Sequence, residues 1–331
     1  MHLSPRTAGP LAALVTVAMW SGFIVIARAS AQRVLTPFDI ALLRVVGASL
    51  VLLPWGWLLV RRQRQARAGS ASQHTPQDSL GGLSPLPLRQ TVLLGLFGGV
   101  LYAVLAYAGF FHAPATHASV LLPGSLPLWT ALLAALVLHD RITPVRAAGL
   151  ALIVAGDLLV GGHGLLSALE GGSVWKGDLL FMAASLCWAC YTVLARRHAV
   201  AAVEATIAIT VLACLVYVPA FALLTGFGWL PSQLARASWG EIGFQLLFQG
   251  GGAVVVSGIT FTRMIQYYGP VRSTMITALV PGLSALGAVA FLQEPLHWNL
   301  LAGLLLVTAG ILLGVLRPRP APCAVEQSPP P

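Results

Sequence analysis

Long apolar stretches separated by short polar segments run along almost the whole chain. They lie at 10–28, 37–60, 91–111, 115–138, 145–161, 177–195, 203–225, 241–262, 271–292 and 297–316. A helix needs about 20 apolar residues to cross a bilayer, and most of these stretches have that length, whereas strands are shorter. Because lipid offers the backbone no hydrogen-bonding partner, we expect helices. The pattern therefore predicts an all-α membrane protein with ten transmembrane helices.

Two polar segments stand out from this pattern. The longest connection, 61–90, is rich in Gly, Ser and Pro, and the tail 317–331 is rich in Pro. Such compositions are typical of flexible chain. We therefore expect a disordered cytoplasmic loop and a disordered cytoplasmic tail. Within the fifth stretch, Gly161-Gly162 is expected to end the helix.

Three blocks of the first half of the chain reappear in the second half in the same order. Trp20 and Arg28 match Trp188 and Arg196 at an offset of 168, Asp39 and Pro54 match Glu204 and Pro219 at 165, and Gly149 and Gly156 match Gly303 and Gly310 at 154. The offset shortens because the first half carries the longer polar connection. The chain thus divides into two repeats, 10–161 and 177–316, of five spans each.

An odd number of spans in each repeat fixes their relation. If the first repeat starts on one side of the membrane, the second starts on the other, so the repeats are inverted. The arginines and the lysine indicate the side: with the N-terminus in the cytoplasm, 14 fall in cytoplasmic segments and 4 outside, while Arg44 lies within a span. This asymmetry predicts that both termini are cytoplasmic. We expect the protein in the plasma (inner) membrane.

Composition excludes other classes of protein. The chain is 57% hydrophobic and 9% charged, too little charge for a soluble globule and too apolar for a disordered chain. Its net charge of +9 belongs mostly to the cytoplasmic arginines, so we expect no nucleic-acid partner. Cys187 and Cys190 have the spacing of a metal-binding pair, but no second pair exists, so we expect no metal and no cofactor.

Several short motifs resemble the EamA domain. They are Trp20 and Trp188 near the starts of spans one and six, Leu43-Arg44, and the block Gln293-Glu294-Pro295-Leu296 followed by Leu301-Ala302-Gly303 and Ala309-Gly310. Two such domains make the ten-span architecture of the drug/metabolite transporter superfamily. The resemblance implies a secondary transporter, often an exporter of amino acids or other small metabolites, with a central cavity shared by both repeats.

The first repeat departs from this family pattern at two places. His139-Asp140-Arg141 stands where Gly-Glu-Arg or Gly-Glu-Pro is usual. Asp157 stands where an aliphatic residue is expected, as Ile311 does in the second repeat.

Two charged residues lie inside apolar spans, where charge is costly and normally faces the protein interior or water. Arg44 is either a counter-ion for an anionic substrate or carboxylate, or a structural arginine that bonds carbonyls or reaches an interface. Asp157, placed near the external end of span five, is either a proton carrier in coupled transport or a solvated acid. Neither choice follows from the residues alone.

Aromatic and polar residues supply the remaining candidates for the substrate cavity. Trp20, Tyr102, Trp188 and Tyr191 combine an apolar ring with a polar group, and the alternative for them is ordinary packing. Gln245 and Gln249, four apart on one helix face, face either the cavity or another helix. Thr274 is a milder candidate of the same kind.

The leading hypothesis is a secondary transporter that works by alternating access. No G-x-x-x-x-G-K-[ST] motif is present, so energy would come from a solute or proton gradient, or from exchange. The expected partners are a small-molecule substrate, a proton or counter-solute, and the lipid bilayer; a homodimer is left open. A membrane-embedded enzyme and a channel are the alternatives. The enzyme would need a catalytic motif such as H-E-x-x-H, which the chain lacks.

Overall fold

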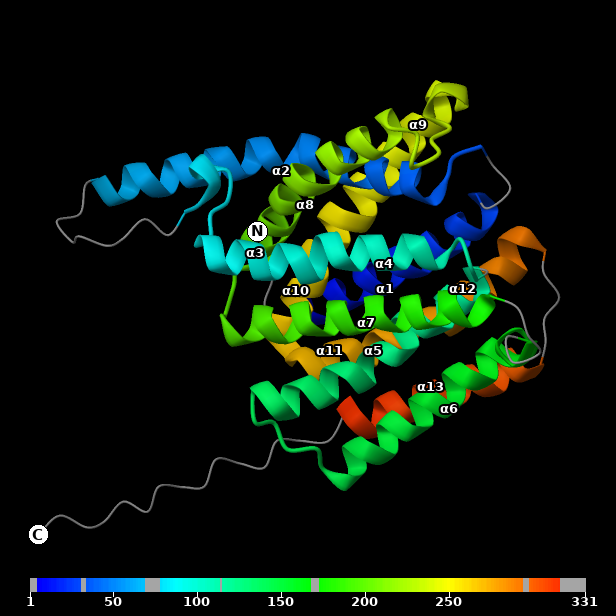
Figure 1. The fold of residues 1–331 in the computed structure, drawn as a ribbon. Helices are drawn as coiled ribbons and strands as arrows, with labels where there is room; N and C mark the ends of the chain where they lie inside the picture. Colours follow the sequence, from blue (N-terminus) through cyan, green and yellow to red (C-terminus); the bar gives the residue numbers. More distant parts are fainter. Residues whose placement is uncertain are drawn as a thin grey trace, which may run out of the picture.

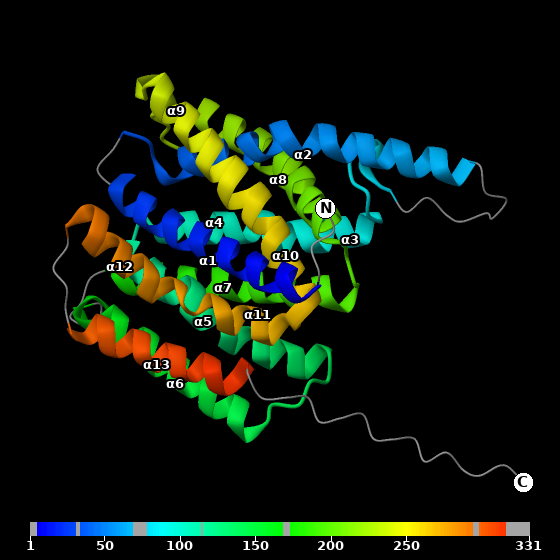
Figure 2. The same cartoon turned by 180° about the vertical axis from the view of Figure 1, so that it is seen from behind.

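The structure is a computed structural model that describes residues 5–30, 34–68, 78–113, 115–167, 173–293 and 298–315. Helices account for most of these residues. An isolated bridge between Ser79 and Ser84 is the β-type pairing found among them. The helices lie roughly along one direction, as Figures 1 and 2 show.

The first half contains the elements up to α6, and the second half begins with α7. In the first half they are α1 (Pro5–Ser30), α2 (Pro37–Ala68), η1 (Leu80–Gly82), α3 (Leu88–Gly95), η2 (Leu96–Val100), α4 (Leu101–Gly109), α5 (Ala115–Val137) and α6 (Pro144–Ser167). In the second they are α7 (Val174–Arg197), α8 (Ala202–Gly226), η4 (Leu234–Arg236), α9 (Trp239–Gln245), η5 (Leu246–Val256), α10 (Ser257–Tyr268), α11 (Pro270–Thr277), α12 (Val280–Leu292) and α13 (Trp298–Val315).

Helices follow the expected apolar stretches closely. Among the residues that the structure describes, eight helical segments are long and apolar enough to cross a membrane, and α13 carries a shorter apolar segment over Trp298–Gly314. The chain is therefore a multi-pass membrane protein. Ten spans remains a prediction. As expected for an N-cap, the Thr143 hydroxyl accepts a hydrogen bond from the Arg146 N–H at 3.3 Å, just before α6.

Two sequence expectations need correction. Helix α6 continues through Gly161 and Gly162 to Ser167, because lipid leaves a helix backbone no better partner than itself. Asp157 thus lies in the middle of α6 and not near its end. The tail 317–331 lies outside the described residues.

The connection 61–90 is in part ordered, contrary to the expectation of a disordered loop. Helix α2 continues to Ala68 through a run of Arg, Gln and Ala, which are good helix formers. Arg64 on this extension pairs with Asp78. Ahead of α3, the Ser84 and Thr91 hydroxyls are hydrogen-bonded at 2.7 Å.

The third helical segment of each half contains a π-helix. In the first half it is η2, between α3 and α4, and in the second half it is η5, between α9 and α10. Both are rich in glycine, with Gly98 and Gly99 in η2 and a run of three glycines in η5. The shared irregularity is a structural counterpart of the sequence repeat.

The last helices of the two halves, α6 and α13, pack side by side (Figures 1 and 2). A methyl group on Gly149 would lie 2.7 Å from the Gly310 carbonyl oxygen, and one on Gly156 would lie 2.6 Å from that of Gly303. The helices therefore run antiparallel. Because Gly149 matches Gly303 and Gly156 matches Gly310 in the sequence repeat, each contact is the counterpart of the other.

A second pair of close contacts also joins the two halves at glycines. A methyl group on Gly47 of α2 would meet the Leu246 carbonyl oxygen at 2.3 Å, and one on Gly95 of α3 would meet the Leu212 Cβ at 2.5 Å. Gly47 and Leu212 are partners at the repeat offset of 165. In both contacts the first half supplies the glycine and the second half supplies the leucine.

These contacts predict that Gly156→Ala lowers the free energy of unfolding by about 1–3 kcal/mol, because the added methyl overlaps the backbone of α13. Gly243→Ala is the matched control, since a methyl there meets nothing within 4 Å. Denaturant titration of both purified proteins in detergent checks this. Equal stability of the two variants would contradict the described α6–α13 contact.

Candidate functional site

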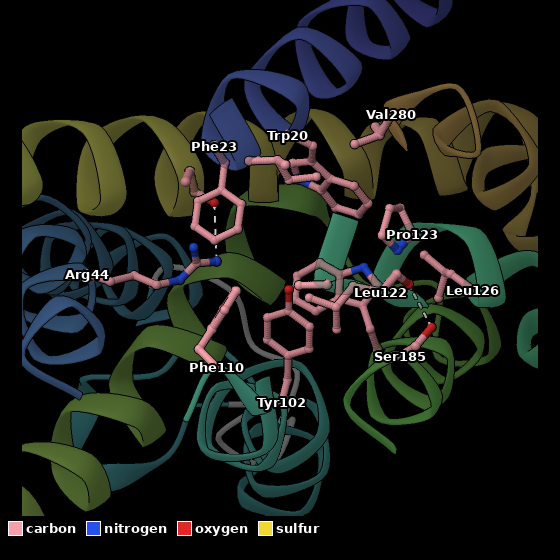
Figure 3. Close-up of a pocket in the computed structure, with 14 residues that line it drawn as sticks. Trp20, Phe23, Arg44, Tyr102, Phe110, Leu122, Pro123, Leu126, Ser185 and Val280 are labelled. Carbon is pink, nitrogen blue, oxygen red and sulfur yellow. Dashed lines mark hydrogen bonds between the residues drawn. The ribbon is translucent and has the colours of Figure 1, made fainter. Parts of the chain in front are cut away.

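A central cavity lies where helices of the two halves meet (Figure 3). It holds about 680 Å³ of unfilled space, its mouth included. Its walls come from the first half at Trp20, Phe23, Ile24, Arg44, Tyr102, Phe110, Ala118, Leu122, Pro123 and Leu126, and from the second at Ser185, Trp188, Ala253 and Val280. A largely apolar lining with a few polar groups is typical of sites that bind small organic molecules.

Aromatic rings from both halves form one wall of the cavity. Trp188 of α7 lies at their centre, 4.8 Å from the ring of Tyr102, 5.8 Å from Trp20 and 5.8 Å from Phe261, measured between ring centroids. Tyr191, one turn further along α7, lies 5.1 Å from Trp188. Rings that pack tilted or edge to face on several helices make a stiff apolar surface, because such pairs have preferred geometries.

The polar groups of these rings differ in whether they have a partner. Trp20 Nε1 donates to Ser257 Oγ at 3.2 Å, and the Tyr191 and Thr262 hydroxyls are bonded at 2.6 Å. Trp188 Nε1 is buried and has no partner among the described residues. Since buried donors are normally bonded, this N–H lacks its usual partner in the described arrangement.

Arg44 carries the positive charge of the cavity. It enters from α2, with its guanidinium 5.8 Å from the centroid of the Phe23 ring (Figure 3). It donates to the Ala253 carbonyl oxygen at 3.4 Å, longer than a good hydrogen bond. Within the described part of the chain no acidic side chain forms an ion pair with it. A guanidinium placed in this way can bind an anionic group.

The predicted cavity residues separate into two groups. Trp20, Arg44, Tyr102 and Trp188 meet at the cavity, and Tyr191 lines a hollow that shares Arg44, Tyr102 and Trp188 with it. The other three candidates do not line either hollow, although all are buried: Gln245, Gln249 and Thr274.

The polar groups of these three residues are either hydrogen-bonded within their own helix or buried away from both hollows. The Thr274 hydroxyl donates to carbonyls of its own helix, at 3.2 Å to Pro270 and 3.0 Å to Val271. The side-chain oxygens of Gln245 and Gln249 are buried without a partner among the described residues. The sequence correctly excluded lipid as their environment but did not distinguish the cavity from another helix.

Asp157 does not line the cavity. It packs against α5, where a methyl group on Gly124 would lie 2.7 Å from its Oδ2. Asp157 is 3% exposed, and neither carboxyl oxygen has a partner in the described part of the chain. Pro123, the neighbour of Gly124, lines the cavity, so α5 connects the two sites.

Asp39 is a second buried acidic residue, and its carboxyl group has a full set of hydrogen-bond donors. It is fully buried, and four groups donate to it at 2.6 to 3.0 Å: the Thr36 N–H and hydroxyl, the Ser232 hydroxyl and the Gln233 N–H. Asp157 has none of this. Burying a lone carboxyl group without hydrogen-bond partners costs free energy.

Some cavity residues were not among the sequence candidates. Phe23 lies three residues after Trp20 and Ser185 three before Trp188, so each shares a helix face with a predicted residue. That spacing could have identified them. Ser185 Oγ donates to the Leu122 carbonyl oxygen of α5 at 2.8 Å and so joins the two halves (Figure 3).

A part-buried pair of side chains joins the starts of α5 and α7. His117 Nδ1 lies 2.8 Å from Asp178 Oδ1, and the rings of Phe110 and Phe181 pack edge to face with centroids 5.1 Å apart. Neither His117 nor Asp178 was a sequence candidate, because a single His and a single Asp far apart in the chain carry no spacing signal.

A multi-pass helical bundle with a central cavity between two related halves is typical of a membrane transporter. Comparison with known proteins agrees. The model of the EamA-like transporter family matches residues 7–162 and 175–316. The chain belongs to this family.

Two relatives carry names that fit this class. The chain is 26% identical over 229 residues to an uncharacterized transporter, YyaM, of Bacillus subtilis (strain 168), an alignment that covers 68% of the chain and 73% of the relative. It is 26% identical over 217 residues to an uncharacterized transporter of Archaeoglobus fulgidus, covering 64% of the chain and 66% of that relative.

A solved structure shares the fold. One protein crystal structure matches 95% of this chain and 98% of its own, with a TM-score of 0.62 and 21% identity. At that identity the likeness concerns the fold alone.

The aromatic wall predicts that Tyr191→Phe destabilises the protein by about 1 kcal/mol, because a buried hydrogen bond to Thr262 is lost. Tyr267→Phe is the control, since Tyr267 is 46% exposed. Thermal unfolding in detergent compares the two. A Tyr191→Phe protein as stable as the control would show that the hydroxyl pair does not hold α7 against α10.

Proposed function

We propose that the protein is a secondary transporter that exports small metabolites, such as amino acids, by alternating access between two inverted five-helix repeats. The observation that carries the proposal is the central cavity built from both halves, with Arg44 and Trp188 as its polar groups. Ten spans in the plasma membrane belong to the same proposal. The direction of transport rests on the resemblance to the EamA domain.

The reciprocal contacts between the halves support the inverted relation. The Gly149–Gly310 contact recurs as Gly156–Gly303 with the halves exchanged, as a two-fold axis requires. The antiparallel α6–α13 pair puts that axis across the helices and therefore within the plane of a membrane that the helices cross. Two states related by exchanging the roles of the halves would then open the cavity to opposite sides.

The proposed orientation places both termini in the cytoplasm. Helix α1 begins and α13 ends at the same end of the bundle (Figures 1 and 2). This agrees with an even number of crossings. The excess of arginines in the segments at that end supplies the direction.

Arg44 and the aromatic wall suggest a substrate with two features. The guanidinium would take an anionic group such as a carboxylate, because it has no acidic partner among the described residues. The rings of Trp20, Tyr102 and Trp188 would hold an apolar or aromatic body.

Asp157 would couple transport to protons. Its carboxyl group is buried without a partner among the residues that the structure describes, so proton exchange would require α5 or α6 to move and to admit water or a cation. Because Asp157 packs on Gly124, next to cavity residue Pro123, that movement would reach the cavity wall.

Arg44→Gln should lower export of carboxylate metabolites by about ten- to a hundredfold, as the loss of a charge-assisted bond of about 1.5–3 kcal/mol implies. Arg44→Lys should retain part of the activity. The test compares metabolites in the medium of cells that overproduce wild type or variant, against a strain lacking the protein. Arg236→Gln, on η4, is the control.

Three outcomes of that screen are distinguishable. If Arg44→Gln lowers the amounts of anionic metabolites in the medium and of no others, the role of Arg44 is supported. An unchanged profile in a normally produced Arg44→Gln protein contradicts it. If wild type itself changes no metabolite, and if the purified protein in liposomes gives conductance steps, the transporter mechanism is wrong.

Asp157→Asn should abolish uphill transport driven by a pH gradient while leaving counterflow at equal pH within about twofold, because the amide cannot exchange a proton. The assay uses purified protein in liposomes and the metabolite found in the export screen. Glu204→Gln is the control, since Glu204 is already hydrogen-bonded to Gln63 at 3.1 Å. Gradient-driven transport by Asp157→Asn at the wild-type rate would exclude proton coupling at this site.

A further inference from the structure

A further hollow, polar and distinct from the central cavity, lies where α5 and α7 end. Its lining includes Arg146, Arg196, Arg197 and Arg272, and Asp140 is the acid among its lining residues. The hollow holds about 1380 Å³ of unfilled space, much of it open to the outside. We call these four arginines and their surroundings the basic hollow.

The basic hollow is formed by helix ends from both halves. Arg146 lies in the first turns of α6, Arg196 and Arg197 end α7, and Arg272 lies in the first turn of α11. The chain reaches α11 through Gly269, whose φ of +79° allows the sharp break after α10. The site therefore depends on the tertiary arrangement and not on one basic segment.

A packed layer separates the basic hollow from the central cavity. Along α7, Arg196 lies eight residues beyond Trp188, about 12 Å at the helical rise. Between them, Val193 packs with Met275 and Ala131 in a cluster of buried side chains. A ligand in the basic hollow would therefore not occupy the transport cavity.

Charge in the hollow is strongly unbalanced. Four arginines face one carboxylate, a formal excess of three positive charges. Arg146 donates to the Arg141 carbonyl oxygen at 3.3 Å, and Arg196 and Arg197 are exposed. Concave surfaces of one sign concentrate the field and attract counter-ions. Arg146, Arg196 and Arg197 repel one another unless an anion lies among them.

The number and type of these groups select the chemistry of that anion. A guanidinium binds carboxylate or phosphate oxygens in pairs, and one arginine balances the single charge of a carboxylate. A phosphate has more acceptor oxygens and more charge and can be shared by arginines on several helices. Tyr267, Tyr268 and Gln266 add hydroxyl and amide groups to the lining.

We propose that the basic hollow is a binding site for a phosphate-bearing anion, separate from the substrate cavity. The phosphate belongs either to an anionic lipid headgroup, for which basic pockets between helix ends are suited, or to a soluble phosphorylated metabolite. Since both halves line the hollow, the bound anion bridges them and stabilises the described arrangement of this end.

Thermal unfolding of the purified full-length protein in neutral detergent tests the site. The probes are inorganic phosphate, glycerol 3-phosphate and short-chain phosphatidylglycerol, with short-chain phosphatidylcholine as the neutral lipid and sodium chloride at matched ionic strength. We expect a saturable rise in Tm of at least about 3 °C with a phosphate-bearing probe and none with chloride. Saturation only with phosphatidylglycerol assigns the headgroup, and saturation with the soluble probes assigns the metabolite.

Substitutions test whether the probes bind in the basic hollow. The double variant Arg196→Gln, Arg272→Gln should weaken the apparent affinity at least about tenfold, whereas Arg62→Gln, on the exposed extension of α2, should leave it unchanged. Asp140→Asn should tighten binding, which guards against a double variant that merely loses stability. Equal shifts with chloride, or equal weakening by Arg62→Gln, would overturn the proposal. Metabolite export by wild type is measured separately, so this site can fail while the proposed transport function stands.

Discussion

Close backbone approach at a few glycines is the interaction on which the rest of this structure depends. In a bilayer, apolar side chains gain little by leaving lipid, so helices associate where small residues let their backbones meet. Gly47, Gly95, Gly149 and Gly156 occupy such positions, and at each a single methyl group would overlap the facing helix. All four join one half of the chain to the other. The relation between the halves is thus fixed at the crossings, and the space left between the crossings becomes the cavity.

The cavity depends on the same constraint because large rings need small neighbours. Gly98 in η2 lets the Tyr191 ring approach, since a methyl there would lie 2.8 Å from it. Tyr191 in turn supports Trp188, the centre of the aromatic wall. The π-helices at η2 and η5 shift the register of the glycine runs within otherwise regular helices. Small residues on one helix and rings on the next therefore determine both the tight crossings and the hollow.

Most of the fold could be predicted from the sequence. The lengths of the apolar stretches, the repeated blocks and the helix start at Thr143-Pro144 can all be read directly from the residues. The failures were local in origin: Gly161-Gly162 ends helices in water but not in lipid, and the polar run after Arg61 contains good helix formers as well as loop residues. Within the candidate site, the structure brings repeat-matched Trp20 and Trp188 to the cavity. It does not bring Gln245, Gln249 and Thr274 there, because a polar residue that avoids lipid has two destinations and only tertiary structure distinguishes them. The His117–Asp178 pair left no trace in the sequence pattern.

The charged groups inside the bundle differ in how far their contacts offset the free-energy cost of burying them. This difference distinguishes structural groups from functional ones. Asp39 has a full set of donors, so it is a structural carboxylate that holds the Ser232–Gln233 segment against the start of α2. Arg44 has one long hydrogen bond and an aromatic face, which only partly compensate its charge. Asp157 has no partner among the described residues. A protein selected for stability alone would have no reason to keep the last two, since an apolar side chain of similar size would pack at least as well. Groups that lack partners in one state can gain them in another, from a substrate, a proton or water, and a carrier that visits two states can use that change.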